Sequence, residues 1–143
     1  MTPAHLRPNR ETFALRAWQR HSLVLAVAGT VYVLIGITYV LSPADDSRRI
    51  ALRVALTWLP MPVWGAVWVV VGLLAILSSR WPPASETWGY TTMTGLSTAW
   101  AGFYAAGIIL GAPAQGMSGV LAWGLVAFMW WAISGLVNPT KEG

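Results

Sequence analysis

The stretch SLVLAVAGTVYVLIGITYVL, residues Ser22 to Leu41, decides the fold class. It carries no charged side chain, and a helix of about 20 residues at 1.5 Å per residue covers a hydrocarbon core of roughly 30 Å. Four of the chain's nine lysines and arginines precede it, in a basic segment of residues 1–21. A signal peptide also begins with a basic segment, but its apolar part is only about 7–15 residues long. We therefore predict a retained membrane-spanning helix.

The composition of the whole chain also indicates a membrane protein. Of its 143 residues 56% are hydrophobic and 10% are charged, whereas soluble domains average about 45–50% and about 25%. The net charge of +4 fits contact with anionic lipid headgroups better than nucleic-acid binding, because the cations are concentrated ahead of the first apolar run. Cysteine is absent, which excludes disulfides and thiolate chemistry.

Three further apolar runs follow, so the predicted fold class is all-α: a polytopic integral membrane protein with four transmembrane helices. We expect spans at about residues 22–42, 62–79, 89–111 and 117–137, within one membrane domain of residues 22–137. Residues 138–143 form a short C-terminal tail. The positive-inside rule places both termini in the cytoplasm, because six of the nine cations then lie on that side.

Residues 43–59, between the first two spans, predict an amphipathic helix at the membrane surface. Ser42 has the character of an N-cap, because a proline and then an acidic residue follow it. Arg49 and Arg53 lie four residues apart on one face, where they avoid the cost of burial in lipid. The residues expected to face the headgroups or the interface are Arg16, Trp18, Arg20, Arg49, Arg53, Trp58, Trp81 and Trp88.

No catalytic, cofactor-binding or metal-binding site is predicted. The expected spans contain no Asp, Glu, Lys, Arg or His, whereas proton relays and ion-coupled transporters normally need such residues at depth. His5 and His21 lie in the tail and at its membrane edge, where a solvated or headgroup-facing histidine is the ordinary interpretation. Asp45 and Asp46 could form a catalytic pair or a divalent-cation site, but capping of a helix start explains them better.

The third span has the most unusual composition, because threonines follow one helical stripe and small residues surround them. Gly107 and Gly111 form a GxxxG pair. Two interpretations stay open: close helix packing through small residues, which we favour, and a hydroxyl stripe that lines a lesion when several copies assemble. The residues of this helix-packing or pore-lining face are Thr91, Thr94, Gly95, Thr98, Ala101, Gly102, Ala105, Gly107 and Gly111.

Ten tryptophans in 143 residues are a high number, and their positions predict two roles. Those near the ends of the spans suit the aromatic belts at the membrane interfaces, and Trp64 could join them. An aromatic cage for a quaternary ammonium or a quinone is a weaker alternative. The deeper tryptophans, expected to pack against helices or lipid tails, are Trp68, Trp100, Trp123, Trp130 and Trp131.

The order of these features resembles a group of small four-span membrane proteins of actinobacteria and their phages. The likeness runs through TWLPMPVWGAVWVVVGLLAI (57–76) and RWPPASETWGYTTMTGLSTAWAGFYAAG (80–107) to a tryptophan-rich last span. Some of that group are taken as holins, so the resemblance implies holin-like permeabilisation. Our leading hypothesis is a non-enzymatic homo-oligomer that self-associates in the cytoplasmic membrane. The alternatives are an accessory or scaffold subunit bound to another membrane protein and, less favoured, a small-molecule carrier.

Overall fold

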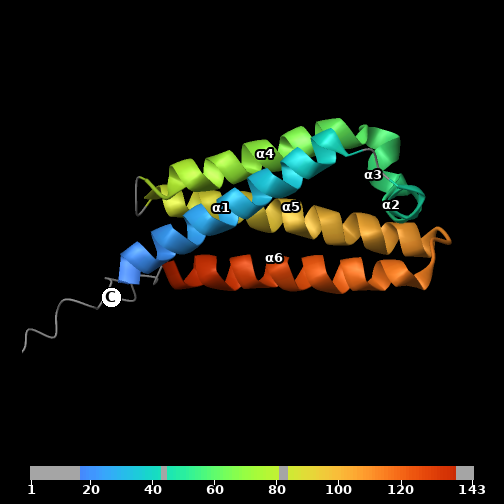
Figure 1. The fold of residues 1–143 in the computed structure, drawn as a ribbon. Coiled ribbons are helices and arrows are strands. Elements are labelled where there is room, and N and C mark those ends of the chain that lie inside the picture. The colour runs from blue at the N-terminus through green and yellow to red at the C-terminus, as the bar shows by residue number, and fades with distance from the viewer. Residues whose placement is uncertain (1–16, 43–44, 81–83, 138–143) are drawn as a thin grey trace, which may run out of the picture.

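The computed structural model describes residues 17–42, 45–80 and 84–137, and within these ranges the chain forms helices and no strands, as the sequence predicts. The helices are α1 (Ala17–Leu41), α2 (Asp46–Ala51), α3 (Arg53–Trp58), α4 (Met61–Ser78), α5 (Ala84–Ile109), the short 3-10 helix η3 (Ala114–Gly116) and α6 (Met117–Val137). The four long helices run alternately in opposite directions, and α2 and α3 lie at the end where α1 finishes and α4 begins (Figure 1).

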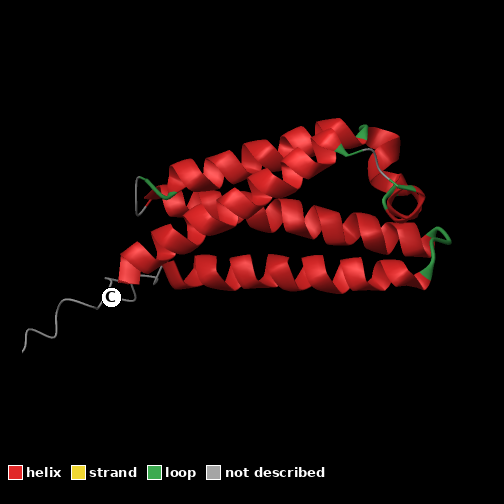
Figure 2. Ribbon diagram, in the orientation of Figure 1, coloured by secondary structure: helices red, strands yellow, loops and turns green. Residues whose placement is uncertain are grey.

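The bundle consists of two helix hairpins. Helix α1 packs along α4, helix α5 packs along α6, and the contact between α4 and α5 joins the two pairs. Figure 2 shows the short turn that connects α5 to α6. Because α6 packs mainly on α5, only 11% of its apolar stretch is buried, compared with 33% for α1 and for α4. Helix α5 is therefore the central element of the molecule.

Four glycines bring α1 and α4 into backbone contact, and we call them the glycine seam: Gly29, Gly36, Gly65 and Gly72. A Cβ added to Gly36 would lie 2.6 Å from the carbonyl oxygen of Gly65, and one added to Gly29 would lie 2.6 Å from that of Gly72. The relation is reciprocal, because the two helices are antiparallel and each carries its glycines seven residues apart. Small residues of this kind let membrane helices approach closely.

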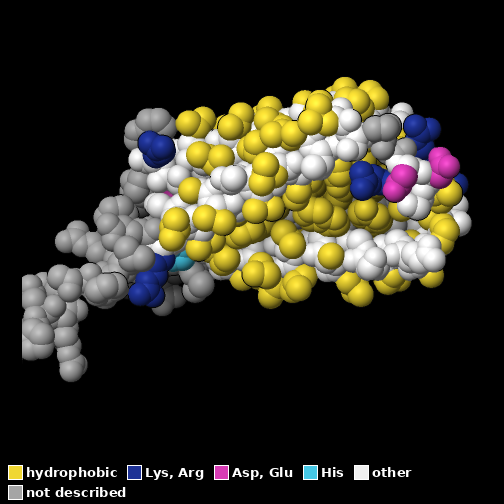
Figure 3. All heavy atoms as spheres, in the orientation of Figure 1, with side chains coloured by type: hydrophobic (Ala, Val, Ile, Leu, Met, Phe, Trp, Pro, Cys, Tyr) yellow, Lys and Arg dark blue, Asp and Glu magenta, His cyan; other side chains and the backbone are white. Residues whose placement is uncertain are grey.

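Three helical segments in the described part of the chain are long and apolar enough to cross a membrane: Arg20–Leu41, Met61–Ser78 and Ala114–Gly135. They correspond to α1, α4 and α6 with its preceding turn. Helix α5 is longer, at 26 residues, but is not among them. Figure 3 shows an apolar surface along the middle of the bundle, with the charged side chains at its two ends. This distribution is typical of a membrane protein.

The turn between α5 and α6 begins with a glycine in the left-handed conformation. Gly111 has a φ of 92°. Its N–H donates to the carbonyl oxygen of Ile108 and the N–H of Ala112 donates to that of Gly107, both at 2.9 Å. This pair of bonds is a Schellman motif, which satisfies carbonyl groups at the end of a helix. Gly111 thus ends α5 and directs the chain back along it.

The structure corrects the single helix predicted over residues 43–59. The segment forms two short helices, α2 and α3, separated at Leu52, whose side chain is fully buried. Helix α2 begins after Asp45, so Asp45 takes the N-cap role predicted for Ser42. Ala55 of α3 is also buried, so this segment packs on the bundle with one side.

Candidate functional site

Helix α5 has one side in the interior of the bundle and one side outside it. The interior side carries four residues with no exposed surface: Tyr90, Met93, Ser97 and Trp100. We call the outer side the α5 small-residue face, made of the exposed residues Thr91, Gly95, Thr98 and Gly102. A Cβ added to Gly95 or Gly102 would meet no atom within 4 Å. This face is therefore open in the isolated chain.

The predicted stripe of the third span is divided between these two sides. Thr94, Ala101 and Ala105 are half-buried and do not belong to the open face. The Thr94 hydroxyl donates to the carbonyl oxygen of Tyr90 at 2.8 Å, so its own helix satisfies it. The division follows from helix geometry, because two residues three positions apart in the sequence differ by about 60° in direction around the helix axis.

The GxxxG pair Gly107 and Gly111 does not form one surface. Gly107 is buried, and a Cβ there would collide with the carbonyl oxygen of Ala51 in α2. Gly111 lies beyond the last residue of α5, in the turn described above. The first glycine therefore permits α2 to dock on α5, and the second ends the helix.

Aromatic side chains from all four long helices fill the middle of the bundle. Trp68 is fully buried, and its ring centroid lies 4.8 Å from that of Trp123, 4.9 Å from that of Tyr32 and 5.4 Å from that of Trp100. The members of this aromatic core are Tyr32, Tyr39, Trp64, Trp68, Trp100, Phe103 and Trp123. The interior of a single bundle is thus occupied by side chains.

Two kinds of polar group accompany these rings. The Tyr32 hydroxyl forms a hydrogen bond with that of Ser97, and it also accepts one from Trp130 Nε1 at 2.9 Å, which links α1, α5 and α6. By contrast, the indole N–H of Trp68 is buried without a hydrogen-bond partner. An unpaired buried donor costs about 1–3 kcal/mol, so close packing of the rings must offset it.

Glu86 is a buried acid that the sequence did not reveal. The predicted third span starts at residue 89, with every acidic residue outside the spans, but α5 starts at Ala84 and includes Glu86 in its first turn. Its side chain is only 2% exposed, and its Oε1 accepts a hydrogen bond of 2.7 Å from the Ser22 hydroxyl. The positive end of the helix dipole favours an acid at this place. The sequence signal that could have shown this was an acidic residue shortly after a loop, where the first turn of a helix favours one.

The tryptophans and arginines expected at the interface are exposed where their side chains are described. Trp58 and Trp88 have 77% and 72% of their surface exposed, and Arg20, Arg49 and Arg53 are also exposed. Arg16, Trp81 and the Trp18 side chain lie outside the described residues. Trp64 is partly buried and packs against the core, and its Nε1 donates to the Ala55 carbonyl oxygen at 3.0 Å. Of the deeper tryptophans, Trp131 is 64% exposed.

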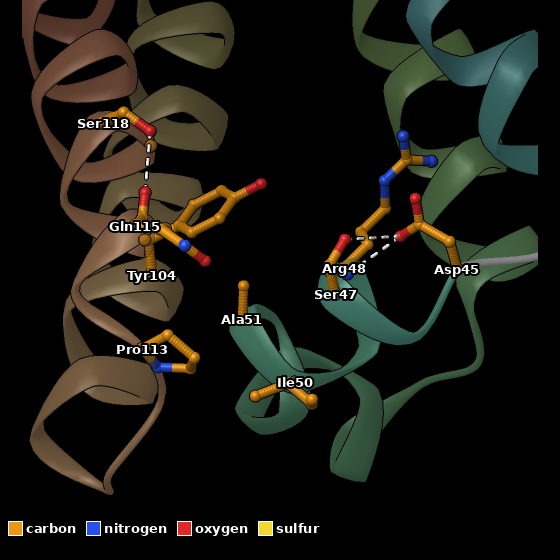
Figure 4. A pocket seen from close by; sticks show the side chains of 11 residues that line it. Asp45, Ser47, Arg48, Ile50, Ala51, Tyr104, Pro113, Gln115 and Ser118 are labelled. Carbon is orange, nitrogen blue, oxygen red and sulfur yellow. Dashed lines mark hydrogen bonds between the residues drawn. The ribbon is translucent and has the colours of Figure 1, made fainter.

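A pocket of about 400 Å³ lies between α2 and the turn from α5 to α6 (Figure 4). Asp45 lies on one side of it, and Tyr104 and Gln115 lie on the other. The Asp45 carboxylate accepts hydrogen bonds from the Arg48 backbone N–H at 2.9 Å and from the Ser47 hydroxyl at 3.2 Å. The prediction that this acid caps a helix is therefore confirmed.

These hydrogen bonds predict a local pH dependence at α2. The Arg48 N–H and the Ser47 hydroxyl bind the charged form of Asp45 and hold its pKa below the ordinary value of 3.8. The stabilisation by the cap is therefore complete above the unfolded-state pKa and is lost as the pH falls through the lower folded-state pKa. We expect the Arg48 amide NMR signal to titrate with a midpoint below 3.8. The control Asp45→Asn should keep the cap without titrating, and a midpoint above the ordinary value would contradict the bond.

Within the described ranges, no group of three or more His, Cys, Asp or Glu side chains is arranged to hold a metal ion. Comparison with protein-family models, with curated proteins and with solved structures finds no match to this chain. The class that the fold defines is an all-helical protein with three helices apolar enough to span a membrane. Its distinguishing features are the α5 small-residue face and the aromatic core.

Proposed function

We propose that this chain is a non-enzymatic protein of the cytoplasmic membrane that self-associates through the α5 small-residue face. The observation that carries the proposal is the open space around Gly95 and Gly102, on an exposed side that also presents the hydroxyls of Thr91 and Thr98. Such a side gains little from contact with lipid tails. Small residues and hydroxyls are instead the groups with which membrane helices pack on one another.

The proposal includes four membrane crossings. Helix α5, the third of the long helices in chain order, crosses in addition to α1, α4 and α6. At about 1.5 Å per residue, the 26 residues of α5 extend beyond a hydrocarbon core of roughly 30 Å. Its neighbours α4 and α6 are both apolar enough to cross, and α5 runs between them. The two helices shield part of its polar surface, and a second copy would cover the rest. The arginine distribution favours both termini in the cytoplasm.

Cysteine cross-linking tests the interface directly, because the natural chain contains no cysteine. We expect Thr98→Cys to give disulfide-linked dimers in membranes. The control Leu125→Cys, on the exposed side of α6 (60% exposed), should give few. Adding Gly95→Leu and Gly102→Leu should weaken association by roughly fivefold to 150-fold, because overpacking of about 1–3 kcal/mol corresponds to that range. Equal cross-linking at both positions would indicate random collision and contradict the interface.

The former candidates Gly107 and Gly111 are unsuitable for this test. Replacing Gly107 would displace Ala51 of α2, and replacing Gly111 would strain the turn after α5. Both changes would disturb the single bundle, so lost association would not report on an interface between copies.

Holin-like permeabilisation is the second candidate function. Two observations support it. The aromatic core fills the interior of a single bundle, so an aqueous path would have to form between copies. The hydroxyls of Thr91 and Thr98 lie on the face where copies would meet. Induced expression with a cytosolic lysin should then give abrupt depolarisation and lysin release, which Gly95→Leu delays. Self-association with intact membrane potential would exclude this role. Co-purification of a different membrane protein, with no linked dimers, would instead support an accessory subunit.

A further inference from the structure

A groove of about 690 Å³ opens where the end of α1, helix α3 and the start of α4 meet. Its walls differ in chemistry. Arg49 and Arg53 supply two cationic side chains, and Leu41, Leu56 and Met61 supply apolar surface. No acidic residue is among the described residues that line it. The groove thus combines a positive edge with an apolar floor.

The third arginine of this segment is directed elsewhere. The Arg48 guanidinium lies over the Tyr39 ring, 5.5 Å from its centroid, in a cation–π contact with the aromatic core. Arg49 and Arg53 line the groove and are therefore the residues that supply its positive charge.

The position of the groove along the bundle matches the boundary between two environments. Leu41 is the last residue of α1 and Met61 the first of α4, so the apolar floor lies at the end of the hydrophobic surface. Arg49 belongs to α2 and Arg53 to α3, the two short helices at one end of the bundle (Figure 1). A ligand that fits must be anionic at one end and apolar at the other.

We propose that this groove binds one anionic phospholipid of the surrounding bilayer. Its phosphate contacts Arg49 and Arg53, and the upper part of an acyl chain lies against Leu41, Leu56 and Met61. Arginine guanidinium groups suit phosphate oxygens because they donate several hydrogen bonds in a fixed plane. Binding here requires no self-association through α5, so cross-linking at Thr98 and lipid binding succeed or fail separately.

Native mass spectrometry of the full chain in neutral detergent provides the test. The probes are phosphatidylglycerol and phosphatidylcholine with identical acyl chains. We expect the wild-type chain to retain one phosphatidylglycerol in preference to phosphatidylcholine. Arg49→Gln and Arg53→Gln should each reduce that preference about fivefold, whereas Arg80→Gln, an exposed arginine outside the groove, should leave it unchanged.

Further measurements keep the result interpretable. Arg49→Lys and Arg53→Lys should restore most of the preference if charge is what matters, and thermal unfolding in the same detergent shows whether each variant is folded. Soluble glycerol phosphate should not displace the lipid; displacement at equal concentration would identify a site for free phosphate and overturn the lipid assignment. Equal retention of both lipids by the wild-type chain, or equal loss in Arg80→Gln, would also overturn it.

Discussion

Replacing Gly36 by alanine is expected to destabilise the bundle, although alanine is the better helix former. The added Cβ would lie 2.6 Å from the Gly65 carbonyl oxygen and 2.7 Å from the Val69 backbone nitrogen. Neither atom can move without the helix, so α1 and α4 must separate along the seam. Overpacking of this kind costs about 1–3 kcal/mol or more. Thermal unfolding in detergent should therefore show a lower midpoint than the wild type, and Gly36→Leu should lower it further.

Gly124→Ala is the matched control. It makes the same chemical change inside a long helix, but a Cβ at Gly124 would meet no atom within 4 Å. Only the propensity gain of up to about 1 kcal/mol remains, so the midpoint should stay the same or rise. If Gly36→Ala and Gly124→Ala have equal midpoints, the close contact between α1 and α4 is not a source of stability.

Removing the Trp68 side chain is expected to have the largest effect of any single substitution. The indole is fully buried and contacts rings from α1, α5 and α6. Trp68→Ala would leave a cavity among these rings, and truncations of this size cost about 3–5 kcal/mol. Loss of near-ultraviolet circular dichroism with retained helix content would show that tertiary packing is what fails.

Two further variants separate the causes. Trp131→Ala removes the same side chain from a position that is 64% exposed, so its effect should stay within about 0.5 kcal/mol. Trp68→Phe keeps an aromatic ring but deletes the N–H that has no partner. Removing that unpaired donor regains about 1–3 kcal/mol of stability, which offsets the cost of the smaller cavity left by phenylalanine. It should therefore resemble the wild type far more than Trp68→Ala does. Equal losses in Trp68→Ala and Trp131→Ala would contradict the central place of Trp68.

The helices that depend on apolar length alone were predictable from the sequence. The expected spans at residues 22–42, 62–79 and 117–137 lie within three residues of the apolar segments Arg20–Leu41, Met61–Ser78 and Ala114–Gly135, although α1 itself begins at Ala17. Continuous apolar runs bounded by proline, glycine or charge carry enough information for this, because the bilayer sets their length. Helix α5 begins five residues earlier than the predicted 89, because Glu86 was assigned to the loop.

The features that depend on contacts between helices were not predictable from the sequence. Gly29 with Gly36 and Gly65 with Gly72 share a spacing of seven residues, but only the antiparallel register of α1 and α4 shows that they meet. The break at Leu52 likewise occurs at a residue that is not a typical helix breaker, and its side chain is fully buried. For the candidate site, the sequence drew attention to the small residues of α5 but could not divide them between an inner and an outer side.

The glycine seam also determines where the molecule can change shape. Backbone in contact with backbone has no rotamers to exchange, so the α1–α4 hairpin should move as a rigid body. The α5–α6 hairpin differs, because there a side chain, the Tyr104 ring, lies against Gly119. Any rearrangement on assembly is then expected at the contact between the two hairpins, where α4 meets α5. The α5–α6 hairpin would move relative to the rigid α1–α4 hairpin.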